Sequence, residues 1–365
     1  MKIADLVRAM EALAPPQFAA AWDNVGLLVG DAGASLSGVL LTIDCTREVL
    51  SDAAREGKGA IVSYHPPIFD PQKRFVAPSI AYEAARAGIA VYSPHTALDV
   101  AEGGTNDVLA DAIGMTGRIP LRACRPDAPD ESALKLVTFV PEGHVEAVSR
   151  AVFDAGAGTI GKYSSCSFRT PGVGTFFGEE GASPVVGQAG RLENAAEVKL
   201  ETVVPRARVD AVVRALRGAH PYEEPAFDLL RLATHEDGRG FGRVGSVTPA
   251  TARALVDRVK AAVGASHVLS VGDLDRHVSR AAVCAGSGGD LLADAIDAGA
   301  ELFLTGELRH HDALRAASAG MIAVCVLHST SERIALASLE KALADRLPGV
   351  SVARSREDRE PFAFV

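Results

Sequence analysis

Short apolar runs alternate with amphipathic segments in two parts of this 365-residue chain, one near each end. The runs have the length of buried strands, and the segments between them carry apolar residues at helical spacing. We predict strands at 39–43, 60–63, 89–92, 281–284, 301–304 and 322–327, and helices at 3–13, 46–55, 79–87, 106–113, 251–263, 290–298, 308–317 and 331–343. Strands separated by helices favour sheets with parallel pairs that are covered on both faces. We therefore expect one α/β core built from both ends of the chain.

The middle of the chain has a different pattern. The elements predicted there are strands or strand-like pieces at 134–140, 164–168, 172–177, 197–204 and 226–232, with helices at 142–155 and 206–216. Their order is roughly β-α-β-β-α-β, which is typical of a ferredoxin-like module. Charged segments with proline or glycine, at 122–132 and 234–239, are predicted to be linkers. The predicted organisation is an N-terminal half of the core at 1–125, an inserted module at 126–238 and a C-terminal half at 239–365.

Composition argues against several classes of function. The chain is 48% hydrophobic and has a formal net charge of −9, so it gives no general electrostatic reason to bind nucleic acid or an anionic membrane. No apolar run reaches the roughly 18 residues of a membrane span. Asp5, Arg8 and Glu11 interrupt the N-terminal segment where a signal peptide would have its apolar core. The five cysteines form no CxxC pair, and we expect them to be free thiols of a cytoplasmic protein.

Metal-ligand side chains follow three of the predicted strands. His65 comes after the strand at 60–63, His95 and Asp99 after that at 89–92, and His328 and Glu332 after that at 322–327. Ligands of open α/β sheets collect at the carboxyl ends of strands, and imidazoles with carboxylates suit first-row metals. Each residue alone has a structural alternative. In particular, Ser329 to Glu332 fits a capping box at the start of a helix.

Other motifs are less specific. The glycine-rich turn at 284–290 either cradles phosphate or is a tight turn, and Glu307 or one of His310 and His311 could line a pocket. Asp23 and Asn24 fit ordinary turn chemistry. The segment 220–225 (HPYEEP) is expected to be a turn or a subunit contact. The GxGxxG at 156–161 follows a predicted helix instead of a strand, which excludes a dinucleotide site.

Several of these stretches together resemble the Nif-three-like family, whose members carry the name GTP cyclohydrolase 1 type 2 homologue. The resemblance covers essentially the whole chain and is carried by WDNVGLLVG (22–30), SYHPPIF (63–69), HTALD (95–99), TGELRHHDAL (305–314) and HSTSE (328–332). The middle, with GAGTIGKYSSCSF (156–168) and HPYEEPAFDL (220–229), resembles the insert of longer bacterial members, which is similar to the ferredoxin-like folds of CutA and PII. The family implies a toroidal homohexamer with metal sites facing an internal cavity.

The resemblance also implies a dinuclear metal site. Its two adjacent histidines fall on Tyr64 and His65, its aspartate on Asp99, its late histidine on His328 and its glutamate on Glu332. Tyr64 departs from the pattern, which has a histidine at this position. A phenol with a reference pKa of about 10 is a poor ligand unless a metal lowers that value. We expect one well-occupied site at His65, His328 and Glu332. A second, weaker site would use Asp99 and Glu332, with Tyr64 or His95 nearby.

Two functions follow from these expectations. The first is a hydrolase that depends on one or two divalent cations (zinc, iron, manganese, nickel or cobalt) and acts on a nucleotide-like substrate, the substrate class that the family name implies. Glu332, His95 and Glu307 are the candidate catalytic residues, of which His95 and Glu307 could move protons. The second is a non-catalytic metal-binding scaffold or regulatory oligomer, in which the inserted module acts in oligomerisation or ligand sensing.

Overall fold

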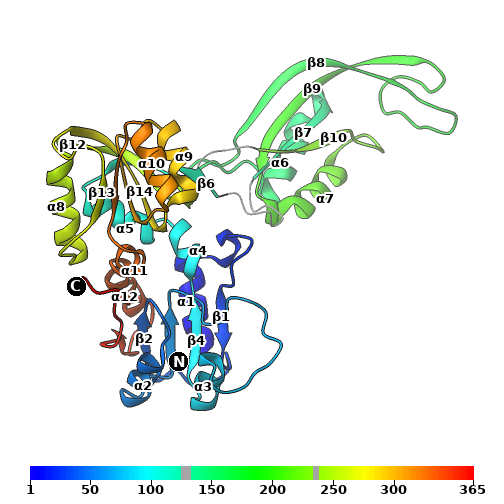
Figure 1. Ribbon diagram of the computed structural model, residues 1–365. Helices are drawn as coiled ribbons and strands as arrows, with labels where there is room; N and C mark the ends of the chain where they lie inside the picture. The colour runs from blue at the N-terminus through cyan, green and yellow to red at the C-terminus, as the bar shows by residue number, and fades with distance from the viewer. Residues whose placement is uncertain (125–132, 233–237) are drawn as a thin grey trace. The chain divides into compact units, whose positions relative to one another are not determined.

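The chain divides into two compact units, which we name unit 1 (Met1–Pro126 with Asp237–Val365) and unit 2 (Asp127–Glu236). The structure, a computed structural model, describes residues 1–124, 133–232 and 238–365 (Figure 1). Most of the two predicted linkers lies outside the described residues. No helix in these three ranges combines the length and the hydrophobicity needed to cross a membrane. The fold is mixed α/β, as predicted, but its strands form several sheets.

The first sheet of unit 1 has the order β1-β4-β3-β2-β17. These strands are β1 (Gly26–Val29), β2 (Val39–Thr42), β3 (Ala60–Ser63), β4 (Ala90–Ser93) and β17 (Val352–Arg354). β4, β3, β2 and β17 run parallel, and β1 pairs antiparallel with β4. Every residue of β2, β3 and β4 is buried, which explains why these strands read as continuous apolar runs without alternation.

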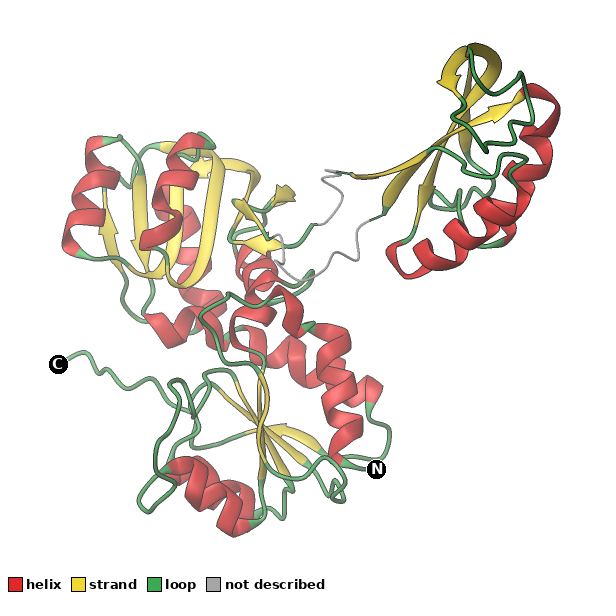
Figure 2. Ribbon diagram, turned by 90° about the vertical axis from the view of Figure 1, so that its right-hand side faces the viewer, coloured by secondary structure: helices red, strands yellow, loops and turns green. Residues whose placement is uncertain are grey.

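Helices cover both faces of the first sheet (Figure 2). α1 (Ile3–Leu13) and α12 (Ala335–Arg346) pack on one face, where Leu6, Met10 and Leu339 join Val39 and Val62 in one core cluster. On the other face, α2 (Arg47–Arg55) and α3 (Ile80–Ala87) pack against alternate residues of the same strands. The carboxyl ends of the parallel strands are left for the short α4 (His95–Val100) and for loops.

The second sheet of unit 1 has the order β13-β16-β15-β14-β12-β5. Its strands are β5 (Thr116–Ile119), β12 (Arg243–Thr251), β13 (Leu269–Val271), β14 (His277–Ser287), β15 (Leu302–Glu307) and β16 (Ile322–Cys325). β14, β15 and β16 are parallel. α5 (Thr105–Ala112) and α8 (Ala252–Val263) pack on one face, and α9 (Leu292–Asp297) with α10 (His310–Ser318) on the other.

The two halves of the chain exchange elements. β17 comes from the C-terminal half and joins the first sheet, whereas α5 and β5 come from the N-terminal half and join the second. A further two-stranded pair joins β6 (Arg122–Ala123) to β11 (Gly240–Phe241). Neither strand of this pair was predicted from the sequence, since β6 falls within the predicted linker at 122–132, and β5, β12, β13 and β17 were not predicted either. β5 is largely exposed, β13 and β17 have only three residues each, and β12 contains Gly245 and Pro249, so none of these four shows the buried-strand pattern.

Unit 2 contains one antiparallel sheet with the order β10-β7-β9-β8. The elements follow in the order β7 (Leu134–Pro141), α6 (Val145–Asp154), β8 (Ser167–Phe177), β9 (Leu192–Val204), α7 (Val209–Ala219) and β10 (Phe227–Arg231). The helices pack on one face around a core that includes Leu136, Val148 and Leu216. The strand-like pieces predicted at 164–168 and 172–177 are one strand, because β8 pairs with β9 without interruption through Pro171 and Gly172. As an edge strand, β8 tolerates proline.

Candidate metal centre

The register of the first sheet brings three chemically active side chains to one edge. Thr42 of β2 pairs with Ser63 of β3, and Asp44 and His65 each follow two residues later. His65 Nδ1 accordingly lies 2.9 Å from Asp44 Oδ1. His95 occupies the equivalent place after β4, and its ring centroid is 5.4 Å from that of His65. The predicted gathering of strand-end residues therefore occurs here, and it includes Asp44, which was not predicted from the sequence.

The second sheet contributes His328 and Glu332 through the short helix α11 (His328–Arg333). Leu327 has φ +78°, and the helix begins directly after it. The predicted start at Ser331 is therefore wrong, and Glu332 does not occupy the capping-box position. Because His328 and Glu332 are four residues apart within one helix, they share a face. Their facing atoms, His328 Nε2 and Glu332 Oε1, are 3.1 Å apart.

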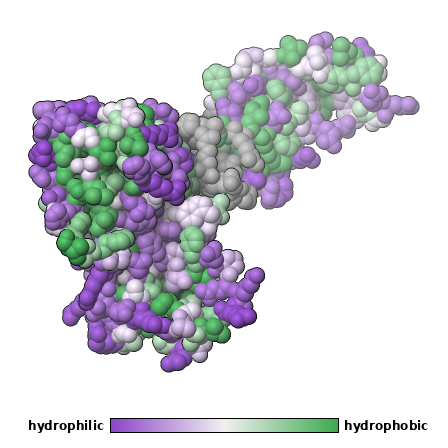
Figure 3. All heavy atoms as spheres, in the orientation of Figure 1, coloured by the Kyte–Doolittle hydropathy of each residue, from purple (hydrophilic) through white to green (hydrophobic). Residues whose placement is uncertain are grey.

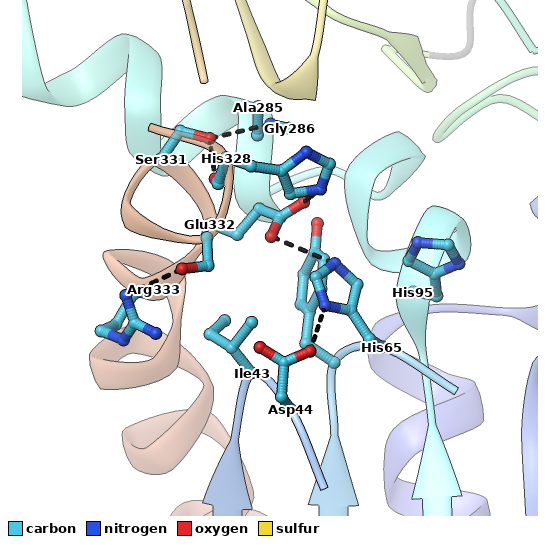
Figure 4. A network of polar contacts seen from close by, with 12 residues as sticks. Ile43, Asp44, His65, His95, Ala285, Gly286, His328, Ser331, Glu332 and Arg333 are labelled. Carbon is cyan, nitrogen blue, oxygen red and sulfur yellow. Dashed lines mark hydrogen bonds and ion pairs between the residues drawn. The ribbon is translucent and has the colours of Figure 1, made fainter. Parts of the chain in front are cut away.

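His65, His328 and Glu332 form a group that could hold a metal ion, with ligand atoms all within 4.8 Å of one another (Figure 4). Glu332 is only 3% exposed, and its Oε2 has no hydrogen bond among the described residues although it lies 3.2 Å from His65 Nε2. A buried carboxylate oxygen without a hydrogen bond is costly unless something else neutralises it. A cation bound between the three side chains would do so, and two imidazoles with one carboxylate are suitable ligands.

Carboxylates hold the other nitrogen of each imidazole. Asp44 lies at His65 Nδ1, and Glu307, at the end of β15, lies 3.2 Å from His328 Nδ1. Such outer partners orient a metal-binding histidine and leave its Nε2 atom for the metal. Both Nε2 atoms point at Glu332. The geometry thus fits a divalent cation and gives Glu307 a position beside the group.

In the absence of a cation, His65 and His328 each form an ion pair with Glu332. Burial lowers the pKa of His65, but the hydrogen bond with Asp44 and the adjacent Glu332 carboxylate raise it overall to about 10. The adjacent Glu332 carboxylate, 3.1 Å away, is the main reason that the pKa of His328 rises to about 9. Burial raises the pKa of Glu332, yet the two histidines hold it below its ordinary value. Without a cation, imidazolium protons therefore neutralise the Glu332 carboxylate.

Asp99 and Tyr64 lie next to this group and pair with each other. The buried Tyr64 hydroxyl donates a hydrogen bond to Asp99 and lies 3.1 Å from Thr105 Oγ1. Burial is the main cause that raises the pKa of Asp99 to about 6, and Glu332 adds to it. Burial followed by the charge of Asp99 raises the pKa of Tyr64 well above 10. Tyr64 is thus a neutral phenol that holds Asp99 in place.

His95 stands beside His65 but outside the three-residue group. Its Nδ1 lies 2.7 Å from Asp23 Oδ1, and its backbone has φ +29°, which is unusual for a residue other than glycine. Asp23 does accept a hydrogen bond from Asn24 N, as turn chemistry predicts. Its contact with His95 spans 72 residues, and no local signal in the sequence could have revealed it.

The glycine-rich turn after β14 closes over Glu332. Gly286 has φ +67°, and a Cβ there would lie 2.7 Å from Glu332 Oε1. Its N–H donates to Ser331 Oγ, and the N–H of Ala285 donates to Asn106 Oδ1. Because these donors are already used, the tight-turn alternative describes this segment better than a phosphate cradle. His310 and His311 are exposed at the start of α10 and are not part of the group.

Unit 2 holds a separate cavity of about 570 Å³. Its walls are mostly apolar, with Phe139 and Phe176 among them, and Tyr222, Glu197 and Lys199 add polar groups. Within the segment 220–225, His220 Nε2 lies 3.0 Å from Phe139 O and its Nδ1 accepts from Tyr222 N. These bonds make His220 a turn residue, which agrees with the turn alternative.

Comparisons with known proteins identify the family of this chain. The chain matches the model of Duf34/NIF3 (NGG1p interacting factor 3) over residues 1–361. Proteins named GTP cyclohydrolase 1 type 2 homolog are similar to it: that of Halalkalibacterium halodurans is 34% identical, with all of both chains covered, and that of Mycobacterium tuberculosis is 38% identical, with 91% of this chain and 88% of the relative covered.

Solved structures agree with this assignment. A Bacillus cereus protein related to NIF3 is 32% identical, with a TM-score of 0.74 over 100% of this chain and 99% of that one. A Staphylococcus aureus protein is 27% identical, with a TM-score of 0.82 and the same coverage. The sequence resemblance is thereby confirmed, and the chain belongs to the Duf34/NIF3 family.

Proposed function

We propose that this protein binds a divalent cation at His65, His328 and Glu332 and uses it to hydrolyse a nucleotide-like substrate. The observation that carries the proposal is the buried Glu332 carboxylate, which faces two imidazole Nε2 atoms and has one oxygen without a hydrogen bond among the described residues. The name of the relatives, GTP cyclohydrolase 1 type 2 homolog, supports a hydrolytic reaction and a purine nucleotide as the substrate class.

The residues around the centre have separate tasks in this proposal. His65, His328 and Glu332 hold the cation, which when bound lowers the pKa of a water molecule and polarises the bond to be cleaved. Asp44 and Glu307 keep the two imidazoles oriented. Glu307 is more than half exposed, so its carboxylate can exchange protons between the centre and solvent. His95 Nδ1 is held by Asp23, which leaves Nε2 to accept or donate a proton.

Metal content per chain tests the cation site. The protein, purified without an affinity tag and reconstituted with zinc, iron, manganese, nickel or cobalt in turn, should contain at least one metal by elemental analysis. His328→Ala should lose it. His277→Ala is the matched control, because His277 is an exposed residue at the amino end of β14, opposite to the centre. No metal in the wild type after reconstitution would contradict the proposal.

Turnover tests the hydrolase. His328→Ala and Glu332→Ala should both abolish hydrolysis of GTP, whereas His277→Ala should not. Activity that survives in both variants of the centre would show that hydrolysis does not use it.

A second, weaker cation position is proposed at Asp99 and Glu332, beside Tyr64. The charge of Glu332 contributes to the raised pKa of Asp99, so the two carboxylates are close enough to interact. Tyr64→His places a second imidazole there and should raise the metal stoichiometry. An unchanged value would mean either that Tyr64 already serves as a ligand or that one cation is the full complement.

A ligand-sensing protein is the second candidate function, and the cavity of unit 2 favours it. The cavity is of the size that binds small molecules, and apolar walls with few polar groups are typical of such sites. Stabilisation in a thermal-shift screen of nucleotides and metabolites, by a ligand that is never turned over, would favour sensing. Glu197→Gln, which removes the charge that accepts the Tyr222 hydroxyl bond, should alter that stabilisation.

We also propose that unit 2 is an inserted ferredoxin-like module at residues 126–238 and that the protein is a homohexamer. The β-α-β-β-α-β order of unit 2 supports the first statement. Hydrophobic residues interrupt the mostly hydrophilic surface in Figure 3, and large side chains such as Phe168 and Leu192 are exposed in unit 2, which supports self-association. Light scattering of the whole chain and of a chain without residues 130–235 would test both the assembly and the contribution of the module.

A further inference from the structure

Two exposed aromatic rings adjoin the metal centre. Trp22 is 64% exposed and Phe69 is 50% exposed, and their ring centroids are 5.9 Å apart with planes tilted by 48°. The indole of Trp22 also meets the ring of His95 edge-on at 6.0 Å, and His95 lies 5.4 Å from the ring of His65. One imidazole therefore separates the exposed indole from a residue of the cation site.

Long-range hydrogen bonds hold the two rings where they are. The side chain of Asp23, next to Trp22, is fully buried and bonds to His95 Nδ1 at 2.7 Å and to the N–H of Thr96 at 3.1 Å. Asn24 donates from Nδ2 to the carbonyl oxygen of Ile68 at 2.6 Å, next to Phe69. Turn chemistry alone does not describe Asp23 and Asn24, because their side chains join three separate segments. These bonds fix the backbone next to both rings, so the fold itself keeps Trp22 and Phe69 exposed.

We infer that Trp22 and Phe69 form a stacking platform for the planar heteroaromatic ring of the substrate. Aromatic rings bind the face of a nucleobase, and such stacking contributes roughly 5- to 100-fold in affinity when measured by truncation. A ring on this platform would lie beside His95, with the rest of the ligand directed towards His65, His328 and Glu332. This last step rests on the proposed function, whereas the stacking itself does not require a bound cation.

Trp22 is the only tryptophan of the chain, so its fluorescence reports directly on the platform. Guanosine should quench it in a saturable manner in the full-length protein, and ribose 5-phosphate, which lacks the ring, should not. Phe69→Leu should weaken guanosine binding by roughly 5- to 100-fold while keeping the reporter. Phe75→Leu is the matched control, because Phe75 is 51% exposed in the same loop and packs on Tyr82 instead. Equilibrium dialysis with Trp22→Leu gives an independent reading.

The outcomes separate this inference from the proposed function. Quenching that persists in His328→Ala, together with loss of its metal, supports a platform that works independently of the cation. Quenching without any metal in the wild type would leave the platform standing and contradict the cation site. Absence of saturable quenching, or equal effects of Phe69→Leu and Phe75→Leu, would overturn the platform. Acrylamide quenching of Trp22 should also be measured at several protein concentrations. If acrylamide quenches the indole only after the protein is diluted, the inference is overturned, because a second copy of the chain then covers the rings at high concentration.

Discussion

At the scale of single residues, the geometry of the centre depends on which group faces each of the two nitrogens of His65 and of His328. His65 and His328 both place Nδ1 against a carboxylate and Nε2 against Glu332. Neither arrangement follows from the local sequence. Asp44 is 21 residues from His65, and Glu307 is 21 residues from His328. The residues with the greatest influence on cation affinity therefore include side chains that would not bind the cation themselves.

Asp44→Asn should weaken cation binding while leaving all three proposed ligands in place. Loss of an outer carboxylate partner typically reduces metal affinity by about 10- to 100-fold. Competition with a chromogenic chelator would measure the change. Asp345→Asn, on the exposed side of α12, is the control and should bind like the wild type. Equal affinities for the two variants would show that Asp44 does not orient His65.

Gly286→Ala should disturb the centre beyond the ordinary cost of a left-handed alanine. That cost is about 1–2 kcal/mol, and the new Cβ would also lie 2.7 Å from Glu332 Oε1. Gly264→Ala is a matched control, because Gly264 has φ +70° with nothing within 4 Å of the added Cβ. We expect both variants to lose stability in denaturant unfolding but only Gly286→Ala to lose cation affinity. Retained affinity in Gly286→Ala would show that Glu332 can shift freely.

At the scale of elements, the chain after β17 braces the centre. Asp358 accepts from the N–H of Ile43 at 3.0 Å and from Arg333 Nε at 2.8 Å, so it links the end of β2 to α11. Glu360 accepts from the hydroxyls of Ser329 and Thr330 in the same helix. The C-terminal segment thereby connects the residue before Asp44 with the residue after Glu332.

Asp52 anchors this segment to α2, and its contribution should depend on pH. Its side chain is fully buried and accepts from Ser355 Oγ at 2.7 Å and from Arg356 N at 3.0 Å. Burial raises the pKa of Asp52, but these bonds hold it below its ordinary 3.8. A lowered folded-state pKa stabilises the fold above the unfolded-state value, and that stabilisation is lost as pH falls through the folded-state value.

Asp52→Asn should therefore be less stable than the wild type by about 1–3 kcal/mol at neutral pH, because buried polar partners are left without the carboxylate. The difference should begin to narrow below a pH of roughly 4, where Asp52 of the unfolded chain takes up a proton, and should be lost once pH falls through the lower folded-state value. Urea unfolding at several pH values would measure it, with the exposed Asp257→Asn of α8 as control. A gap that stays constant with pH would mean that the charge of Asp52 contributes nothing.

At the scale of the whole molecule, unit 1 is held together across its two halves by Arg243 of β12. Arg243 is 1% exposed and donates to Asp107 Oδ1 at 2.6 Å, to the carbonyl oxygens of Gly240 and Gly242, and to that of Ala101. Asp107 belongs to α5, the helix that the N-terminal half contributes to the second sheet. One guanidinium thus joins segments that are more than 130 residues apart in sequence.

Arg243→Met should destabilise unit 1 by about 3–5 kcal/mol, because it leaves the buried Asp107 charge without its closest partner. Arg118, which lies 3.1 Å from Asp107, limits the loss. The double variant Arg243→Met/Asp107→Asn should recover part of the stability in denaturant unfolding. If the double variant is no more stable than the single one, the destabilisation comes from lost backbone bonds instead of the uncompensated charge.

The sequence by itself determined the buried strands and the residue types of the centre. β2, β3 and β4 could be predicted because burial on both faces leaves continuous apolar runs, and His65, His328 and Glu332 could be selected because each follows a strand. Short or exposed strands such as β5 and β17 carry no such signal, since their partners and not their composition place them.

Only the tertiary structure decided how the halves meet. The strand register places Asp44 beside His65, the turn at Leu327 starts α11 early enough to direct Glu332 at both imidazoles, and Asp23 reaches His95 across 72 residues. Each of these contacts joins residues that are distant in sequence, so their cause is the packing of separate segments and no local pattern reports it. Residue identity fixed the chemistry that is available, and packing fixed which groups share a site.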